Sequence, residues 1–160
     1  MKKIILGLAM FSVVSAQAEV RVGDSATYSI YSGSESTGKT ETQTVISIDD
    51  GEVIQNPSVM RLKKSEADSK ILSERLDDIV QTEKALENCD PIPGMPVKGV
   101  KRNIVVDAGI FENTCHYVMY TNGIGEERYL SKDVPFFTVS RSILLQDQSV
   151  TKELQSFVKK

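Results

Sequence analysis

Residues 65–86, SEADSKILSERLDDIVQTEKAL, decide whether the chain is all-β or mixed. The segment has no glycine or proline and is dense in Glu, Lys, Ala and Leu, which favour helix. Ser65 can cap the start of a helix, and Pro91 prevents its continuation. Apolar residues recur at helical spacing and form one stripe, made of Leu72, Leu76, Ile79, Val80 and Leu86. The segment therefore predicts one long amphipathic helix over about residues 65–87.

The segments on both sides of this helix have the alternating, β-branched patterns of strands. Clusters of Gly, Asp, Asn and Ser separate them as turns. The strand-like segments are residues 26–31, 41–48, 52–55, 100–106, 111–120, 127–131, 134–145 and 150–158. Pro57 interrupts the chain after the third of them, which predicts an edge strand or a bulged strand there. These patterns predict an α+β domain in which an antiparallel sheet of six to eight strands packs on one long helix.

Two apolar features are candidates for a ligand or partner surface. The stripe residues Leu72, Leu76 and Ile79 are expected to be core, because a lone domain has to bury such a face; the alternative is a partner surface. Phe136 and Phe137 follow a proline at the start of a predicted strand. Adjacent strand residues point to opposite faces, so one phenylalanine is expected in the core. The other is expected to meet the helix, a ligand or a partner, or to lie exposed.

The first eighteen residues have the pattern of an export signal. Two lysines precede an apolar run over residues 4–14, and residues 16–18, Ala-Gln-Ala, provide a small-x-small cleavage site. The run is far shorter than the roughly 20 residues that a membrane span needs. We therefore expect residues 1–18 to be a cleaved signal peptide and residues 19–160 to be one periplasmic or secreted domain.

Charge and composition argue against two kinds of partner. The chain has 19 basic and 22 acidic side chains, and its net charge of −3 becomes −5 when two lysines leave with the signal. No basic tract interrupts this balance, so no nucleic-acid partner is expected. No second apolar stretch is long enough to cross a membrane, so we expect no membrane span in the mature chain.

The chain has two cysteines, Cys89 and Cys115. In an exported domain two cysteines most simply form one disulfide bond. The chain-entropy account gives a closed loop of roughly 27 residues about 3.5 kcal/mol of stabilisation. The alternatives are two free thiols or an intermolecular bridge. Redox catalysis is not expected, because the cysteines do not have C-x-x-C spacing.

Three fragments of the second half resemble a group of exported bacterial β-rich proteins. Residues 106–111, Val-Asp-Ala-Gly-Ile-Phe, with Cys115 close behind, are similar to a V-x-A-G-x-F…C strand-turn-strand. Residues 129–135, Tyr-Leu-Ser-Lys-Asp-Val-Pro, are similar to W-x-S-x-x-V-P, with Tyr129 in the place of the usual Trp. The third fragment is Cys89 and the Pro/Gly-rich loop that follows it.

This group in turn is similar to the lipoprotein-carrier (LolA-like) half-barrel, whose members bind acyl chains or lipoproteins in the periplasm. The resemblance implies a curved, half-barrel-like sheet and a lipid or a lipidated protein as partner. The chain departs from the pattern in two ways. It has no Trp, and its one predicted helix covers less of the concave face of the sheet than the helices of these carriers do. Since a fold does not determine a function, the resemblance implies the compartment and the sheet more than the ligand.

The sequence contains no recognisable catalytic or metal-binding constellation. His116 is the only histidine, and it is expected to face solvent while its neighbour Cys115 points to the opposite face of the strand. Two cysteines and one histidine fall short of a zinc site once the cysteines are bridged. Asp49-Asp50-Gly51 lacks the spaced oxygens of a calcium loop. We therefore predict no catalytic residue, no metal ligand and no cofactor.

Three functions are compatible with the sequence, and they predict different structures. A non-enzymatic binding protein would hold an apolar ligand, a lipid or a lipidated partner between sheet and helix, in an apolar pocket of at least about 300 Å3. A cell-envelope structural or protein-interaction module would have a solid core. It would also have an exposed apolar patch near Phe136 or Phe137, or a free strand edge near Pro57. A hydrolase, the third candidate, would need carboxylates that converge in a cleft with displaced pKa values.

Overall fold

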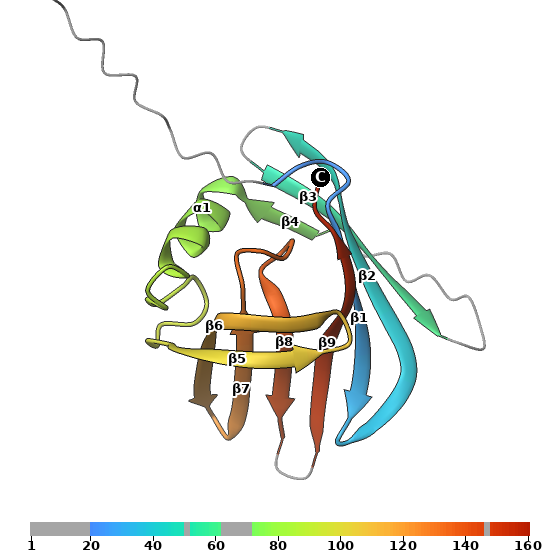
Figure 1. Cartoon of the computed structure of the whole chain (residues 1–160), viewed down its shortest axis with the longest axis vertical. Helices are drawn as coiled ribbons and strands as arrows, with labels where there is room; N and C mark the ends of the chain where they lie inside the picture. Colours follow the sequence, from blue (N-terminus) through green and yellow to red (C-terminus); the bar gives the residue numbers. More distant parts are fainter. Residues whose placement is uncertain (1–19, 50–51, 62–71, 146–147) are drawn as a thin grey trace, which may run out of the picture.

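The structure, a computed structural model of the chain, describes residues 20–49, 52–61, 72–145 and 148–160. In these ranges nine strands form one antiparallel sheet with the order β4-β3-β2-β1-β9-β8-β7-β6-β5 (Figure 1). Pairing of β1 with β9 joins the two halves of the chain into this single sheet. The elements are β1 (Ser25–Ser32), β2 (Glu35–Asp49), β3 (Glu52–Arg61), β4 (Leu72–Arg75), α1 (Leu76–Ala85), β5 (Val100–Val106), β6 (Gly109–Thr121), β7 (Ile124–Leu130), β8 (Thr138–Leu144) and β9 (Ser149–Val158).

The predicted long helix is wrong, and so is the predicted α+β fold packed on it. Leu72–Arg75 form β4, which pairs with residues 52–55 of β3, and α1 spans only Leu76–Ala85. Residues 65–71 of the predicted helix and the predicted signal peptide lie outside the described residues. Helix propensity is a weak preference, and the edge of β3 gives residues 72–75 strand hydrogen bonds instead. The fold is therefore mostly antiparallel β, with one short helix in the described part of the chain.

The hairpin formed by β5 and β6 covers the sheet where the long helix was expected. Figure 1 shows this hairpin lying across β7, β8 and β9. Its turn is tied to β9, because the backbone N–H of Ala108 donates to the carbonyl of Leu154 over 3.1 Å. Val106 packs in one core cluster with Tyr28 and Leu154 of the central strands, and Phe111 packs against it. The β5–β6 hairpin, which lies at one end of the strand order, thus forms much of the cover of the sheet.

A bulge bends this hairpin. The pairing of β5 with β6 shifts between Arg102 and Ile104, and Asn113 opposite the shift has a φ of 54°. Asparagine tolerates this left-handed conformation better than most residues. The Asn113 backbone N–H donates to the side-chain oxygen of Asn103 over 2.9 Å, which holds the bulge. Bulges bend and twist a strand, and this bend lets the hairpin cross its neighbours.

The start of β8 is buried: Val139 and Ser140 are 0% and 4% exposed, and the pairing of β7 with β8 shifts at this point. Further along β8, the Arg141 side chain is 44% exposed. β3 runs through Pro57 without the predicted interruption, and Pro57 pairs with Gln43 of β2. Among the described strands, none pairs with the outer side of residues 56–61, which is where a sheet tolerates proline. No helix in the described ranges is long and apolar enough to span a membrane.

Candidate functional site

Four of the five residues predicted to form an apolar surface meet in one cluster. Leu76 and Ile79 of α1, together with Phe136 and Phe137, surround Val45 and Val53 of the sheet. We call this cluster the apolar junction. Ile79 is 3% exposed, and Val45 and Val53 are 1% and 0% exposed. Leu72, the fifth residue, belongs to β4 and pairs with Gln55 of β3. The cluster is therefore part of the core.

The prediction that Phe136 and Phe137 point to opposite faces of a strand is wrong, because neither residue is part of a strand. Both have left-handed backbone conformations, with φ of 61° and 59°, and β8 begins only at Thr138. A turn holds them: the N–H of Phe137 donates to the carbonyl of Val134 over 3.1 Å. Phe136 and Phe137 both contact the apolar junction. Such conformations cost on the order of 1–3 kcal/mol each and persist only when the surrounding packing enforces them.

The space left at the apolar junction is small. The cavity lined by Phe136 and Phe137 has a volume of about 20 Å3, which is room for one water molecule. Its lining also includes four charged residues, Asp24, Glu83, Lys132 and Lys159. A drug-sized or acyl ligand needs about 300 Å3 or more. The junction as described is thus filled by its own side chains.

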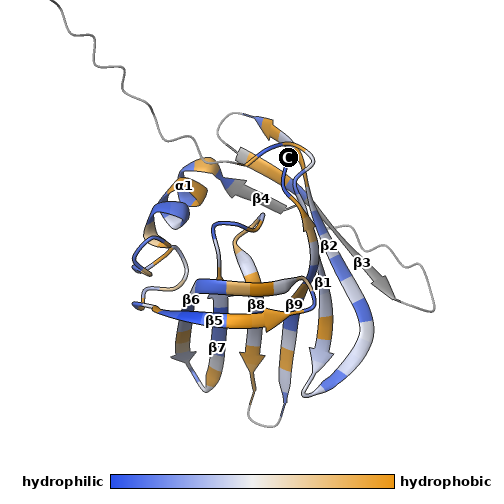
Figure 2. Ribbon diagram, viewed as in Figure 1, coloured by the Kyte–Doolittle hydropathy of each residue, from blue (hydrophilic) through white to orange (hydrophobic). Residues whose placement is uncertain are grey.

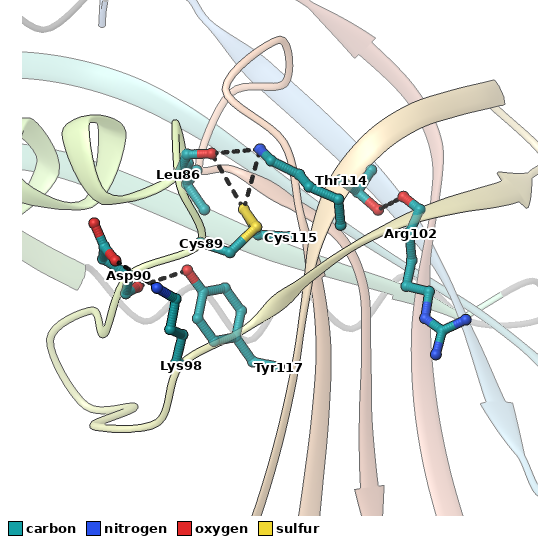
Figure 3. The surroundings of a disulfide bond; sticks show 9 residues. Leu86, Cys89, Asp90, Lys98, Arg102, Thr114, Cys115 and Tyr117 are labelled. Atoms are coloured by element: carbon teal, nitrogen blue, oxygen red, sulfur yellow. Dashed lines mark hydrogen bonds and ion pairs between the residues drawn. A yellow bond between two sulfur atoms is a disulfide. The ribbon is translucent and has the colours of Figure 1, made fainter.

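The predicted disulfide bond between Cys89 and Cys115 is confirmed (Figure 3). The Cα atoms lie 5.2 Å apart, within the usual range for a bridge, and both cysteines are 1% exposed. The Tyr117 hydroxyl donates to the carbonyl of Asp90 over 2.8 Å, and burial, with a contribution from Asp90, raises the pKa of Tyr117 to about 12. The Lys101 ammonium donates to the carbonyl of Leu86 over 2.8 Å. Together these contacts attach the end of α1 and the following loop to β5 and β6.

A second, larger cavity lies beside the disulfide. Its volume is about 380 Å3, and it is bordered by the end of α1, the β5–β6 hairpin and the loop after β7. Its lining is mostly charged or polar: Glu87, Lys101, Glu112, Asn113, Ser131, Lys132 and Asp133, with Leu86 and Leu130. An apolar ligand would leave these groups without water or partners, so this cavity does not fit the predicted pocket.

His116 is more buried than predicted. Its side chain is 15% exposed and stacks on Tyr129, with ring centres 4.3 Å apart. Its Nε2 lies 2.7 Å from a carboxylate oxygen of Glu127. Burial raises the pKa of Tyr129, and Glu127 raises it further. Cys115 belongs to a core cluster and is bridged, so it offers His116 no thiol nucleophile. No group of three or more His, Cys, Asp or Glu in the described ranges is arranged to hold a metal ion.

The strand register creates a charged feature that the sequence did not predict. Arg128 of β7 lies opposite Arg141 of β8, which lies opposite Lys152 of β9. The row continues through Ile30 to Lys39 of β2. Residues opposite one another across neighbouring strands share a face, so these four basic residues lie on one face of the sheet. We call Arg128, Arg141, Lys152 and Lys39 the cationic row.

Two carboxylates partly neutralise the cationic row. Arg128 and Arg141 both donate through Nε to Glu126 Oε1, over 2.7 and 2.6 Å. Burial raises the pKa of Glu126, but hydrogen bonds from both arginines, together with their charges, outweigh burial and lower it. Lys152 pairs with Glu41 over 2.6 Å. Burial lowers the pKa of Lys152, while Glu41 opposes this shift.

Comparison of the chain with protein-family models, with curated proteins and with solved structures found no match. The resemblance to lipoprotein carriers therefore remains a prediction from sequence fragments.

Replacing Glu126 with glutamine should destabilise the protein in a pH-dependent way. The pKa of Glu126 is lower in the folded state than the ordinary value of 4.5, so its stabilising effect is present above that value and disappears as pH falls. We expect a loss of about 1 kcal/mol at pH 7, since the pair is partly screened by solvent. Urea unfolding at pH 7 and pH 3 measures this loss. An equal loss of unfolding free energy at pH 7 and pH 3 would contradict a stabilising role for the ionised Glu126 side chain. Glu112→Gln, which changes an exposed carboxylate, serves as the control.

Proposed function

We propose that this chain is an exported, non-enzymatic module of the cell envelope that binds another protein through its β5–β6 hairpin. The signal-like pattern of residues 1–18 supports export. The buried disulfide between Cys89 and Cys115 fits an oxidising compartment outside the cytosol. The filled apolar junction supports a module with a solid core over a carrier with an internal ligand.

One cross-strand pair carries the proposal. Val105 of β5 and Ile110 of β6 lie opposite each other and are 72% and 71% exposed. They belong to the β5–β6 hairpin, which lies at one end of the strand order. Among the described strands, β5 pairs with a neighbour on one side only. Figure 2 shows that β5 is hydrophilic in its first half and hydrophobic in its second. An exposed apolar pair at a sheet edge is an aggregation hazard that a bound partner strand would remove.

The other candidate, a carrier of an apolar ligand or a lipidated partner, has less support. It requires space between sheet and helix, and the cavity at the apolar junction has only about 20 Å3. Phe136 and Phe137, the predicted ligand contacts, are held by a turn and packed on the core. The carrier would have to open this packing before it could bind.

Site-specific photo-crosslinking in the living cell tests the proposed hairpin surface. A photoreactive residue at position 105 should capture one envelope protein, and Ile110→Lys should abolish the adduct by placing a charge in the contact. Val158→Lys is the matched control, because Val158 is an exposed valine at the end of β9. Absence of a discrete adduct at position 105, or an adduct that survives Ile110→Lys, would contradict the proposal.

A further inference from the structure

The cationic row imposes a cost on the sheet. Like charges directly opposite one another destabilise paired strands, and here Arg128, Arg141 and Lys152 follow one another across three strands. Tyr28 lies two residues before Ile30, and Leu154 lies two residues after Lys152, on the same face as the row. Both side chains are 0% exposed. The row therefore borders the core, where an uncompensated charge is more expensive than at an open surface.

The two arginines use little of their hydrogen-bonding capacity. Each donates through Nε to the same oxygen of Glu126. Among the described residues, the terminal Nη groups of Arg128 and Arg141 have no hydrogen-bond partner. A guanidinium presents such donors in a planar fork that matches the oxygens of phosphate or carboxylate. Neighbouring strands lie about 4.8 Å apart, so two adjacent forks can reach one anionic group.

The row also has an excess of positive charge. Its four basic residues are matched by two carboxylates, Glu41 and Glu126, which leaves two positive charges without a counter-charge in the row. This excess occurs in a chain whose net charge is −3. The side chains of Arg128 and Arg141 are 22% and 44% exposed. They are accessible to a ligand, yet partly shielded from water, which strengthens electrostatic attraction.

We infer that Arg128 and Arg141 form a binding site for a phosphate monoester. Such a group carries a charge of about −1.5 to −2 at pH 7 and three acceptor oxygens, so it balances the excess charge and occupies both forks. The same chemical group occurs in soluble phosphate esters and in the headgroup of phosphatidic acid. The site is on β7 and β8, not on the β5–β6 hairpin, and it does not depend on the proposed protein partner.

Titration calorimetry with phenyl phosphate tests the site on the exported protein. We expect saturable binding that Arg128→Gln or Arg141→Gln weakens by about tenfold or more, since each variant removes a charge-assisted contact. Arg141→Lys keeps the charge and loses the fork, so it should also weaken binding. Arg21→Gln removes an exposed arginine away from the row and should leave the affinity within about twofold. Thermal unfolding of each variant shows that it is folded.

Vesicles distinguish the two sources of the phosphate group. Binding to phenyl phosphate with loss in Arg141→Gln supports a soluble ester as the ligand. Binding only to vesicles that contain phosphatidic acid, and not to phosphatidylcholine vesicles, supports the headgroup if Arg141→Gln abolishes it. Lack of saturable binding to both probes, or equal affinity of the wild type and Arg141→Gln, overturns the inference.

Discussion

The double variant Cys89→Ser, Cys115→Ser should lose about 3.5 kcal/mol of unfolding free energy, because the unfolded chain regains the freedom of a closed loop. For a chain of this size such a loss lowers the thermal midpoint by roughly 10 °C. The loss matters to the whole domain because the bridge attaches the loop after α1 to β6. Without the bridge this loop has more conformational freedom, so the hydrogen bond from Tyr117 to Asp90 becomes less stable as well.

Urea and thermal unfolding of the oxidised wild type and the double variant measure this effect. Reduction of the wild type should reproduce the variant's midpoint, which separates the bond itself from the two substitutions. Tyr117→Phe is a useful comparison, because it removes one buried hydrogen bond and should cost only about 1 kcal/mol. An unchanged midpoint in the double variant would refute a stabilising role for the bridge.

Ile79→Asp should unfold the domain. Ile79 is the buried contact of α1 with Val45 and Val53, and it is 3% exposed. The substitution removes an apolar side chain from the core, which alone costs about 2–5 kcal/mol, and buries a carboxylate. Net stabilities of whole domains are about 5–15 kcal/mol, so a loss of this size removes most of the folded population of a marginal domain.

Leu76→Asp is the matched control for this prediction. Leu76 is half-buried and is the first residue of α1, where a negative charge interacts favourably with the helix dipole. Its aspartate variant should therefore remain folded with a clearly smaller loss of stability than Ile79→Asp. Circular dichroism and urea unfolding measure both variants. A normally folded Ile79→Asp protein would show that α1 is not required to complete the core.

The strands could be predicted from the sequence because their patterns are local. The alternating residues of 26–31, 111–120 and 150–158 all fall within observed strands. The disulfide could be predicted from the compartment and the count of two cysteines. In the described part of the predicted helical segment, helix spans only Leu76–Ala85, and its first turn contains Asp77 and Asp78, which suit a helix N-terminus.

The remaining features depend on contacts between distant residues. Residues 72–75 are strand because the edge of β3 is available to them, and no local pattern reveals that edge. Phe136 and Phe137 both pack against the core because a turn with left-handed backbone precedes β8. The cationic row exists only through the register of β7, β8, β9, β1 and β2. Arg128, Arg141 and Lys152 lie in segments that were predicted as strand, whereas Lys39 lies just before the predicted strand 41–48.

Native mass spectrometry of the protein purified gently from the periplasm tests most directly whether it is an exported module with a closed core. We expect the mass of residues 19–160 with no apolar ligand bound. This mass should be about two units lower than that of the reduced chain, because of one internal disulfide. A stoichiometric fatty acid that is lost in Phe137→Ala would contradict the closed core. Retention of residues 1–18, or a fully reduced chain, would contradict export to an oxidising compartment.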